Sequence, residues 1–302
     1  MSLIAVLLIL SSALLHAGWN LISKYEYPTT TFFLLTLLPA LLPLSVFLVV
    51  FNDVFYHIPP VVWLILAING FFQLLYLAAL AGAYRTGHVS IAYPIARSIP
   101  IIFVALISIF VRHADQLSPA AFTGMVLIVA GCLLLPLQTF RDLHATHYFT
   151  RSTLFALLAS LGITGYSVLD DIALQMLRSS AVITTTNFWT TFIYQTLEYL
   201  SGIVWIALFL FIKREKKEVL LNTLRSKFWG TLAVGVVMLA SSLLVLLSLA
   251  YVNDVSYTVA FRQVSVVIGL IFAVVFIKEP APWPKVAGTL VVFCGLVLVA
   301  VT

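Results

Sequence analysis

Apolar residues are concentrated in ten long segments that follow one another along the whole chain, separated by short polar stretches. Each segment is close to the ~20 residues that a helix needs to cross the hydrocarbon core of a bilayer. A backbone exposed to lipid must satisfy its own hydrogen bonds, and the short alternating strands of a membrane barrel are absent, so we expect helices. The expected spans are Leu3–Ser23, Thr29–Phe51, Pro60–Tyr84, Val89–Val111, Ser118–Pro136, Ser152–Gln175, Val182–Ile212, Phe228–Tyr251, Val255–Ile277 and Ala281–Ala300.

The two halves of the chain resemble each other. Residues 89–110 align without a gap with residues 255–276, and Gly18–Asn20 aligns more weakly with Gly165–Ser167. After a two-residue deletion, two glycines of the fifth segment fall on two of the tenth: Gly124 and Gly131 on Gly288 and Gly295. Because five segments are repeated as five, the second copy must enter the membrane from the opposite face. We therefore predict an all-α membrane protein of ten helices, with one repeat at 1–137, a connecting loop at 138–151 and an inverted repeat at 152–302, around a central cavity.

Composition supports a membrane protein without a soluble domain. The chain is 62% hydrophobic and 9% charged, whereas a soluble domain carries about a quarter charged residues. The first segment lacks the basic start and cleavage site of a signal peptide, so we interpret it as a spanning helix. Cys132 and Cys294 lie inside apolar segments and are interpreted as packing residues. We find no metal motif, nucleotide loop or nucleophile–base set, and His144 and His147 have no evident further ligand, so we expect no enzyme, cofactor or metal.

The charged loops fall into two sets if ten helices cross the membrane. One set contains only Arg112 and Arg178. The other contains Lys24, Arg85, Arg141, Arg151, Lys213, Arg214, Lys216, Lys217, Arg225, Lys227, Lys278 and Lys285. Because basic loops stay in the cytoplasm, both termini are expected outside the cell. The net charge of +5 suits a membrane surface better than a nucleic acid. We expect a multi-pass protein of the bacterial plasma (inner) membrane.

Two arginines are placed deep in apolar segments. Arg97 and Arg262 each lie roughly 11–12 Å from the start of their helix, near the middle of a ~30 Å core. A guanidinium keeps its charge there and needs an anion or strong dipoles. The candidate anions are Asp170, Asp171, Glu198 and a substrate, so each arginine can lock two helices together, face a cavity, or do both. From helix depth we expect Asp170 to pair with Arg262 in at least one state, which leaves Arg97 freer for an anionic substrate.

Other polar residues recur at helical spacing, which indicates a wet interior as well as interhelical hydrogen bonds. The candidate substrate-binding residues are His16, Trp19, Asn20, Gln73, Tyr76, Tyr93, Arg97, Tyr166, Asp170, Arg262 and Gln263. The candidates for proton coupling are His16, Asp170 and Glu198; His16 can equally be neutral and structural, and Glu198 can equally be an anchor. The glycines at 124, 131, 288 and 295 are predicted to form packing seams between helices or between subunits, which would allow a homodimer through the fifth or tenth helix.

Several stretches resemble the ten-helix EamA-like group of the drug/metabolite transporter superfamily, over the whole chain. They are His16–Asn20, Tyr84–Ser90, Tyr93–Ser98, Gly165–Asp170 and Arg262–Gly269. The resemblance implies two inverted five-helix units around a cavity, lined by helices one, three, four, six, eight and nine, with helices five and ten at the periphery. The polar face of helix seven departs from that pattern. Relatives with ten helices are often drawn with both termini in the cytoplasm, opposite to the charge count. Short members bind cations through a glutamate in helix one, where this chain has His16.

Three functions follow from these features. The first is a secondary transporter of a small anionic or zwitterionic metabolite, such as an amino acid, working by alternating access; the two arginines would meet the anion. The second is a carrier or flippase of a lipid-linked or phosphate-bearing group. The third, a non-transporting structural membrane protein, is disfavoured because a passive scaffold could bury leucines in place of polar stripes.

Overall fold

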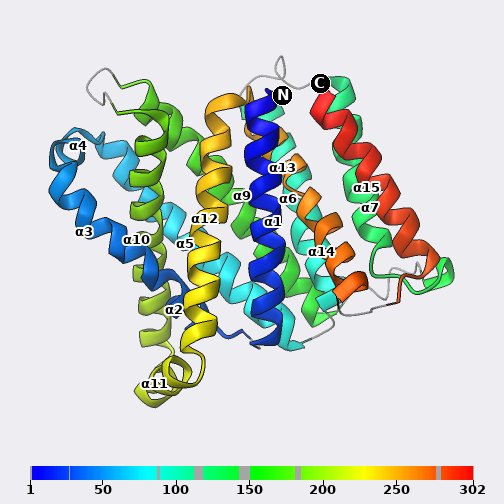
Figure 1. Ribbon diagram of the computed structural model, residues 1–302, viewed down its shortest axis with the longest axis horizontal. Coiled ribbons are helices and arrows are strands. Elements are labelled where there is room, and N and C mark those ends of the chain that lie inside the picture. Colours follow the sequence, from blue (N-terminus) through cyan, green and yellow to red (C-terminus); the bar gives the residue numbers. More distant parts are fainter. Residues whose placement is uncertain are drawn as a thin grey trace.

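The computed structural model describes residues 2–26, 28–86, 89–111, 118–142, 150–180, 185–276 and 280–301. Within these ranges every regular element is helical (Figure 1). The first half contains α1 (Leu3–Tyr25), α2 (Thr30–Leu37), η1 (Leu38–Ala40), α3 (Leu41–Val50), α4 (Asn52–His57), α5 (Pro60–Thr86), α6 (Val89–Val111) and α7 (Pro119–Leu134). The second half contains η3 (Phe140–Asp142), α9 (Arg151–Arg178), α10 (Asn187–Ile212), α11 (Lys217–Ser226), α12 (Phe228–Ser248), η4 (Leu249–Tyr251), α13 (Val255–Phe261), α14 (Val264–Phe276) and α15 (Trp283–Val301).

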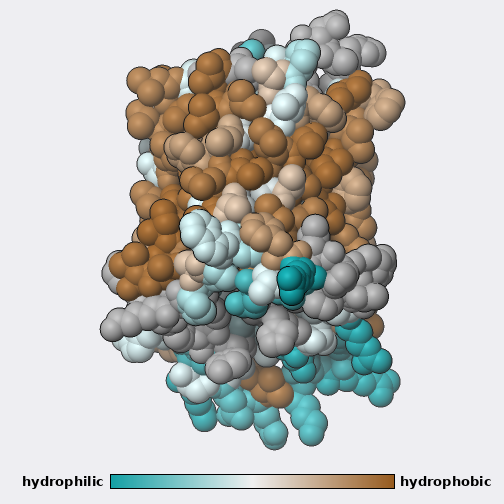
Figure 2. Space-filling model, turned by 90° about the vertical axis from the view of Figure 1, so that its right-hand side faces the viewer, coloured by the Kyte–Doolittle hydropathy of each residue, from teal (hydrophilic) through white to brown (hydrophobic). Residues whose placement is uncertain are grey.

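Seven helical spans in the described part of the chain are long and apolar enough to cross a membrane. Shorter apolar helices cover Thr30–Pro43, Ala96–Phe110 and Pro119–Leu134. The face formed by α7 and α15 shows a broad apolar band, with hydrophilic side chains gathered at one end of the molecule (Figure 2). Leu290 and Phe293 of α15 are more than half exposed, as side chains facing lipid would be. The predicted all-helical membrane architecture is confirmed at this level.

Hydroxyl side chains fix where several of these helices begin. Ser2, Thr29, Ser118 and Thr150 each stand just before an apolar run and accept a hydrogen bond from a backbone N–H of the first turn. An N-cap of this kind satisfies a donor that has no partner within the helix. The helix starts therefore lie within a few residues of the starts expected from hydropathy.

Two of the expected continuous helices are divided. The segment after Thr29 becomes α2, η1 and α3, where Pro39 lies near the start of η1 and cannot donate to a helical hydrogen bond. The segment after Val255 divides at Arg262–Gln263, without a proline or glycine at that point. There the backbone N–H groups of Gln263 and Ser265 donate to Ala260 and Arg262, three residues back. Such bonds tighten the helix into a 3₁₀ turn, which places an irregular backbone next to Arg262.

Close contacts between glycines join α7 and α15 (Figure 1). A Cβ atom built on Gly124 would lie 2.7 Å from the carbonyl oxygen of Gly295, and one on Gly131 would lie 2.6 Å from that of Gly288. Small residues at such crossings let two backbones approach closely. The predicted glycine seam therefore lies between two helices of the same chain. Of the two cysteines, Cys132 is buried beside this seam and Cys294 is exposed, and both are free thiols.

Candidate functional site

A cavity of about 60 Å³ lies between α1, α5, α9, α10, α12 and α13. This volume has room for a few water molecules, which is less than the ~300 Å³ of a typical ligand pocket. Eight residues singled out in the sequence line it: His16, Trp19, Gln73, Tyr76, Tyr166, Asp170, Glu198 and Arg262. They come from four helices (α1, α5, α9 and α10) and the tight turn after α13, so the fold brings together polar stripes that are far apart in the sequence.

One wall of the cavity carries hydrogen-bond donors. The indole N–H of Trp19 donates to Nδ1 of His16 at 3.2 Å, and a guanidinium nitrogen of Arg262 lies 3.4 Å from the same atom. Because Nδ1 accepts from Trp19, the proton of a neutral His16 ring belongs on Nε2. Nε2 of His16 and Nε of Arg262 are both buried, and neither has a hydrogen-bond partner among the described residues. This wall therefore offers two unsatisfied N–H groups, one of them cationic.

A second part of the lining, on α9 and α10, carries acceptors; we call the two parts the donor wall and the acceptor wall. The Asp170 carboxylate accepts from the Asn69 amide at 2.6 Å and from the Tyr194 hydroxyl at 2.9 Å. Glu198, one turn after Tyr194 on α10, accepts a hydrogen bond from Gln73. The second carboxylate oxygen of Glu198 is buried and, within the described chain, has no donor. The same is true of the amide oxygen of Asn69, which holds Asp170 but is not itself a lining residue. This wall is therefore short of hydrogen-bond donors.

Asp170 is held by neutral partners. Its carboxylate bonds to Asn69 of α5 and Tyr194 of α10, whereas Arg262 lies beside His16 of α1. Among the described residues, Asp170 and Arg262 make no ion pair in the state seen here; helix depth led us to expect that pair in at least one state. The physical reason is helix rotation, which turns Asp170 toward α5 and α10. Donors and acceptors thus stay on separate walls.

Three further candidate residues lie outside the cavity lining. Arg97 is 3% exposed and donates to the Ser265 hydroxyl at 3.2 Å, and its Nε is buried without a partner in the described residues. The amides of Asn20 and Gln263 donate to backbone carbonyls one turn earlier, those of His16 and Val259. These side chains are used within and between helices in this state. The side chain of Tyr93 lies outside the described residues.

Tyr199 and Met238 are among the lining residues that were not predicted. Tyr199 follows Glu198 on α10, and its hydroxyl lies 2.6 Å from that of Ser242 on α12. Met238 lines the cavity from α12. Tyr199 belongs to none of the polar stripes, and methionine is an ordinary residue in an apolar helix, so no sequence signal would have marked them. The serines of α12 are a weak sequence signal, and two of them, Ser241 and Ser242, do line the cavity. The hydroxyl group of Ser241 donates to the backbone carbonyl of Ser12, and that of Ser12 donates to the carbonyl of Ser241, which joins α1 to α12.

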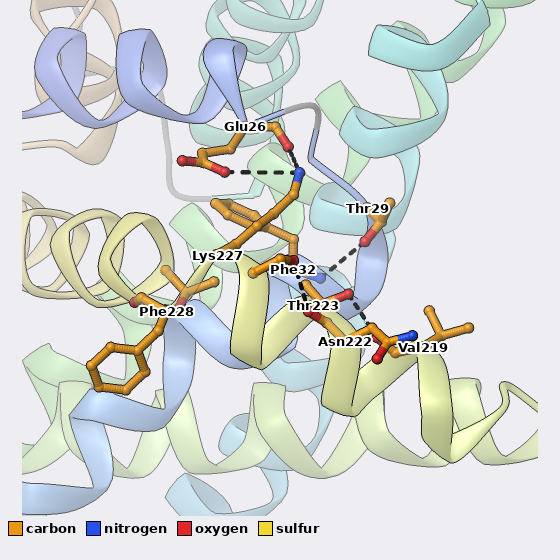
Figure 3. A network of polar contacts seen from close by, with 10 residues as sticks. Glu26, Thr29, Phe32, Val219, Asn222, Thr223, Lys227 and Phe228 are labelled. Carbon is orange, nitrogen blue, oxygen red and sulfur yellow. Dashed lines mark hydrogen bonds and ion pairs between the residues drawn. The ribbon is translucent and has the colours of Figure 1, made fainter.

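The basic end of the molecule is tied together by Lys227 (Figure 3). Its ammonium group donates to the backbone carbonyl of Glu26 at the end of α1, and lies 3.8 Å from the Glu26 carboxylate and 6.0 Å from the ring centre of Phe32. Gly230 makes room, because a Cβ there would lie 2.5 Å from Glu26 Oε1. Along α12 the cavity lining runs from Met238 to the end of the helix, away from Lys227. On α12 the lining therefore begins near the middle of the helix and is separated from Lys227 by the first half of the helix.

Comparisons with known proteins find a similar fold but no matching family. No protein-family model matches the sequence, and no curated protein matches it. A crystal structure of a protein that is 16% identical matches with a TM-score of 0.66, covering 98% of this chain and 96% of that chain. At this identity the likeness shows the fold alone. The arrangement of helices is therefore one that occurs in solved proteins.

Proposed function

We propose that this protein is a secondary transporter of a small zwitterionic or anionic metabolite, with an amino-acid-like compound as the best fit. The observation that carries the proposal is the division of the buried cavity into a donor wall and an acceptor wall. The donor wall has unsatisfied N–H groups on His16 and Arg262, and the acceptor wall has an unsatisfied oxygen on Glu198. Polar groups of this kind are costly inside a membrane protein and mark substrate pathways.

An amino acid carries the complementary groups. Its carboxylate would accept from Arg262 and His16, and its ammonium would donate to Glu198 on the other wall. Each of these bonds involves a charged group, and such bonds are roughly twice as strong as neutral ones. The rings of Trp19, Tyr76 and Tyr166 would enclose the side chain. The small volume of the cavity fits a state in which the walls have closed toward each other.

The packing of the helices supports an inverted repeat. If α1, α2, α5, α6 and α7 correspond to α9, α10, α12, α13–α14 and α15, the helix contacts occur in matched pairs. The contact of α1 with α12 has its counterpart in α9 with α5, that of α1 with α14 in α9 with α6, and that of α2 with α12 in α10 with α5. Gly124 against Gly295 corresponds to Gly288 against Gly131. A pseudo-two-fold axis would exchange the halves, which is how alternating access is built in such folds.

The substrate class is tested by stabilisation of the purified protein. A thermal-shift screen of the twenty amino acids should show an increase in melting temperature for at least one. At about a hundred times its dissociation constant, a ligand that binds only the folded state stabilises by roughly 2.7 kcal/mol. The controls are the same compound without its carboxylate and without its amine, each of which should shift the melting temperature less. Stabilisation by glycerol phosphate with no response to any amino acid would favour the lipid-linked alternative.

Membrane orientation is tested by labelling with a membrane-impermeant thiol reagent. The exposed residues 213–217, four of which are basic, lie at the end of the molecule opposite both termini (Figure 1), and basic loops stay in the cytoplasm. In a background without Cys132 and Cys294, a cysteine at Asn222 should be protected in intact cells and react after permeabilisation. A cysteine at Ser2 should react in both. The reverse pattern would place both termini in the cytoplasm.

A further inference from the structure

A short amphipathic helix lies across the basic end of the molecule, between two candidate membrane-spanning helices. This helix, α11, follows α10 and precedes α12 (Figure 1), and none of its residues is buried. Its half-buried residues, Leu220, Thr223 and Leu224, share one face. Charged and polar residues occupy the opposite face. Because α11 contacts α2 and α12, the half-buried face is covered by the protein, and the charged and polar face is left exposed.

Basic residues are concentrated in and around α11. Residues 213–227 contain six lysines and arginines against two acidic residues. Four of the basic residues, Lys213, Arg214, Lys216 and Lys217, form an exposed turn between α10 and α11. We call residues 213–217 the basic turn. The apolar side chains of Phe211, Ile212 and Trp229, next to this segment, are 81%, 69% and 77% exposed. Exposed aromatic and aliphatic groups beside lysines and arginines are the composition of a membrane interface.

The backbone of the basic turn provides an independent observation. Arg214 has a φ of 54°, in the left-handed region that favours glycine. The N–H of Arg214 bonds to the carbonyl of Phe211, and that of Glu215 to the carbonyl of Leu210, each at 2.9 Å. This is the Schellman ending of a helix, in which glycine is the usual residue at the position of Arg214. Glycine at position 214 would be more favourable for the backbone than arginine. The presence of arginine there points to a use for its guanidinium.

We propose that the basic turn and α11 form a binding surface for anionic lipid headgroups in the leaflet at this end of the protein. The guanidinium of Arg214 and the ammonium groups of Lys213, Lys216 and Lys217 would contact headgroup phosphates, while Phe211, Ile212 and Trp229 reach the acyl chains. Lys213 already lies over the ring of Phe209, 4.6 Å from its centre, so its charged end is held at the level where helix α10 leaves the apolar core. Charge complementarity selects anionic lipid over zwitterionic lipid.

The surface is connected to the cavity through Lys227. This residue directly follows α11 and bonds to the end of α1, and both α1 and α12 line the cavity. A lipid that fixes α11 at the membrane surface would therefore also stabilise the contact between Lys227 and Glu26, which links α12 to α1. The binding itself does not depend on transport, so it can be tested whether or not the substrate proposal is correct.

The experiment titrates the full-length protein in a neutral detergent with phosphatidylglycerol and, separately, with phosphatidylcholine, and counts bound lipid by native mass spectrometry. Each basic group near an anionic surface strengthens binding about fivefold. The triple variant Lys213→Gln, Lys216→Gln, Lys217→Gln should therefore bind phosphatidylglycerol about a hundredfold more weakly, with its melting temperature in detergent unchanged. The matched control is Arg85→Gln, Arg141→Gln, Arg151→Gln, which removes three exposed charges elsewhere and should bind like the unaltered protein.

Arg214→Gly separates the role of the side chain from that of the backbone. The glycine relieves the left-handed strain, so the melting temperature in detergent should increase by about 2 °C. Phosphatidylglycerol binding should nevertheless weaken about fivefold. Equal binding of both lipids by the unaltered protein, or equal losses in the two triple variants, would overturn the proposal, because binding would then reflect net charge or acyl chains alone.

Discussion

Replacement of Gly131 by leucine is expected to prevent α7 from packing against α15 and to leave little folded protein. A Cβ at this position would lie 2.6 Å from the carbonyl oxygen of Gly288 and 2.8 Å from the backbone nitrogen of Val292. These neighbours are main-chain atoms, so they cannot rotate away, and the two helices must separate. Overpacking of this kind costs about 3 kcal/mol or more, which corresponds to a loss of roughly 6–12 °C in melting temperature. Thermal unfolding of the purified variant, with size-exclusion of expressed material, measures this.

A matched pair of alanine variants isolates the steric contribution. Alanine favours a helix over glycine by about 1 kcal/mol when nothing is in its way. Gly269 of α14 has no atom within 4 Å of a built Cβ, whereas Gly131 has three below 3 Å. Gly269→Ala should therefore stabilise the protein, and Gly131→Ala should destabilise it. Equal melting temperatures for the two variants would show that α7 and α15 do not approach as closely as described.

Much of the helical architecture follows from hydropathy, because a segment that must bury its backbone in lipid has little choice but to be a helix. The spans at α1, α5 and α12 were predicted to within a few residues for this reason. The break in α2–α3 could have been expected from Pro39. The break between α13 and α14 could not, since Arg262–Gln263 contains neither proline nor glycine. Residues 213–227 were expected to be a basic loop, because α11 is too short to appear as a spanning helix in the hydropathy pattern.

The candidate site was predicted in its composition but not in its pairing. Spacing of three and four residues correctly places His16 with Trp19, and Gln73 with Tyr76, on common helix faces, because helical periodicity alone decides this. Which neighbouring helix a given face meets depends on the rotation of each helix about its axis, and the spacing of residues along the sequence does not determine that rotation. Asp170 therefore bonds to Asn69 and Tyr194 in place of Arg262. The same limit applies to Arg97, which has the right depth for the cavity but turns toward Ser265.

The two buried arginines should consequently differ in function, although they lie at similar depth and were equal candidates by sequence. Arg262 lines the cavity, and its Nε is free for a ligand anion. Arg97 is outside the lining and bonds to Ser265 of α14. Arg262→Gln should weaken binding of the amino acid selected by the thermal-shift screen by about 10- to 150-fold, which corresponds to the loss of a hydrogen bond to a charged group. Arg97→Gln, the matched control, should leave the dissociation constant within about threefold of that of the unaltered protein. Arg97 does not line the cavity, and a residue that makes no contact with the ligand contributes little to its affinity.

Both variants are to be compared by ligand titration of purified protein and by uptake into proteoliposomes. Arg262→Gln should still fold, since Arg262 makes no direct ion pair with a carboxylate among the described residues, and it should lose uptake together with binding. Arg97 is buried, and among the described residues its guanidinium bonds to a hydroxyl and to no carboxylate. Replacing it removes a charge that is expensive to keep away from water, so the stability of Arg97→Gln should be maintained or increased. A large loss of affinity in Arg97→Gln with normal binding in Arg262→Gln would mean that the substrate is held between α6 and α14, and that the donor wall described here is structural.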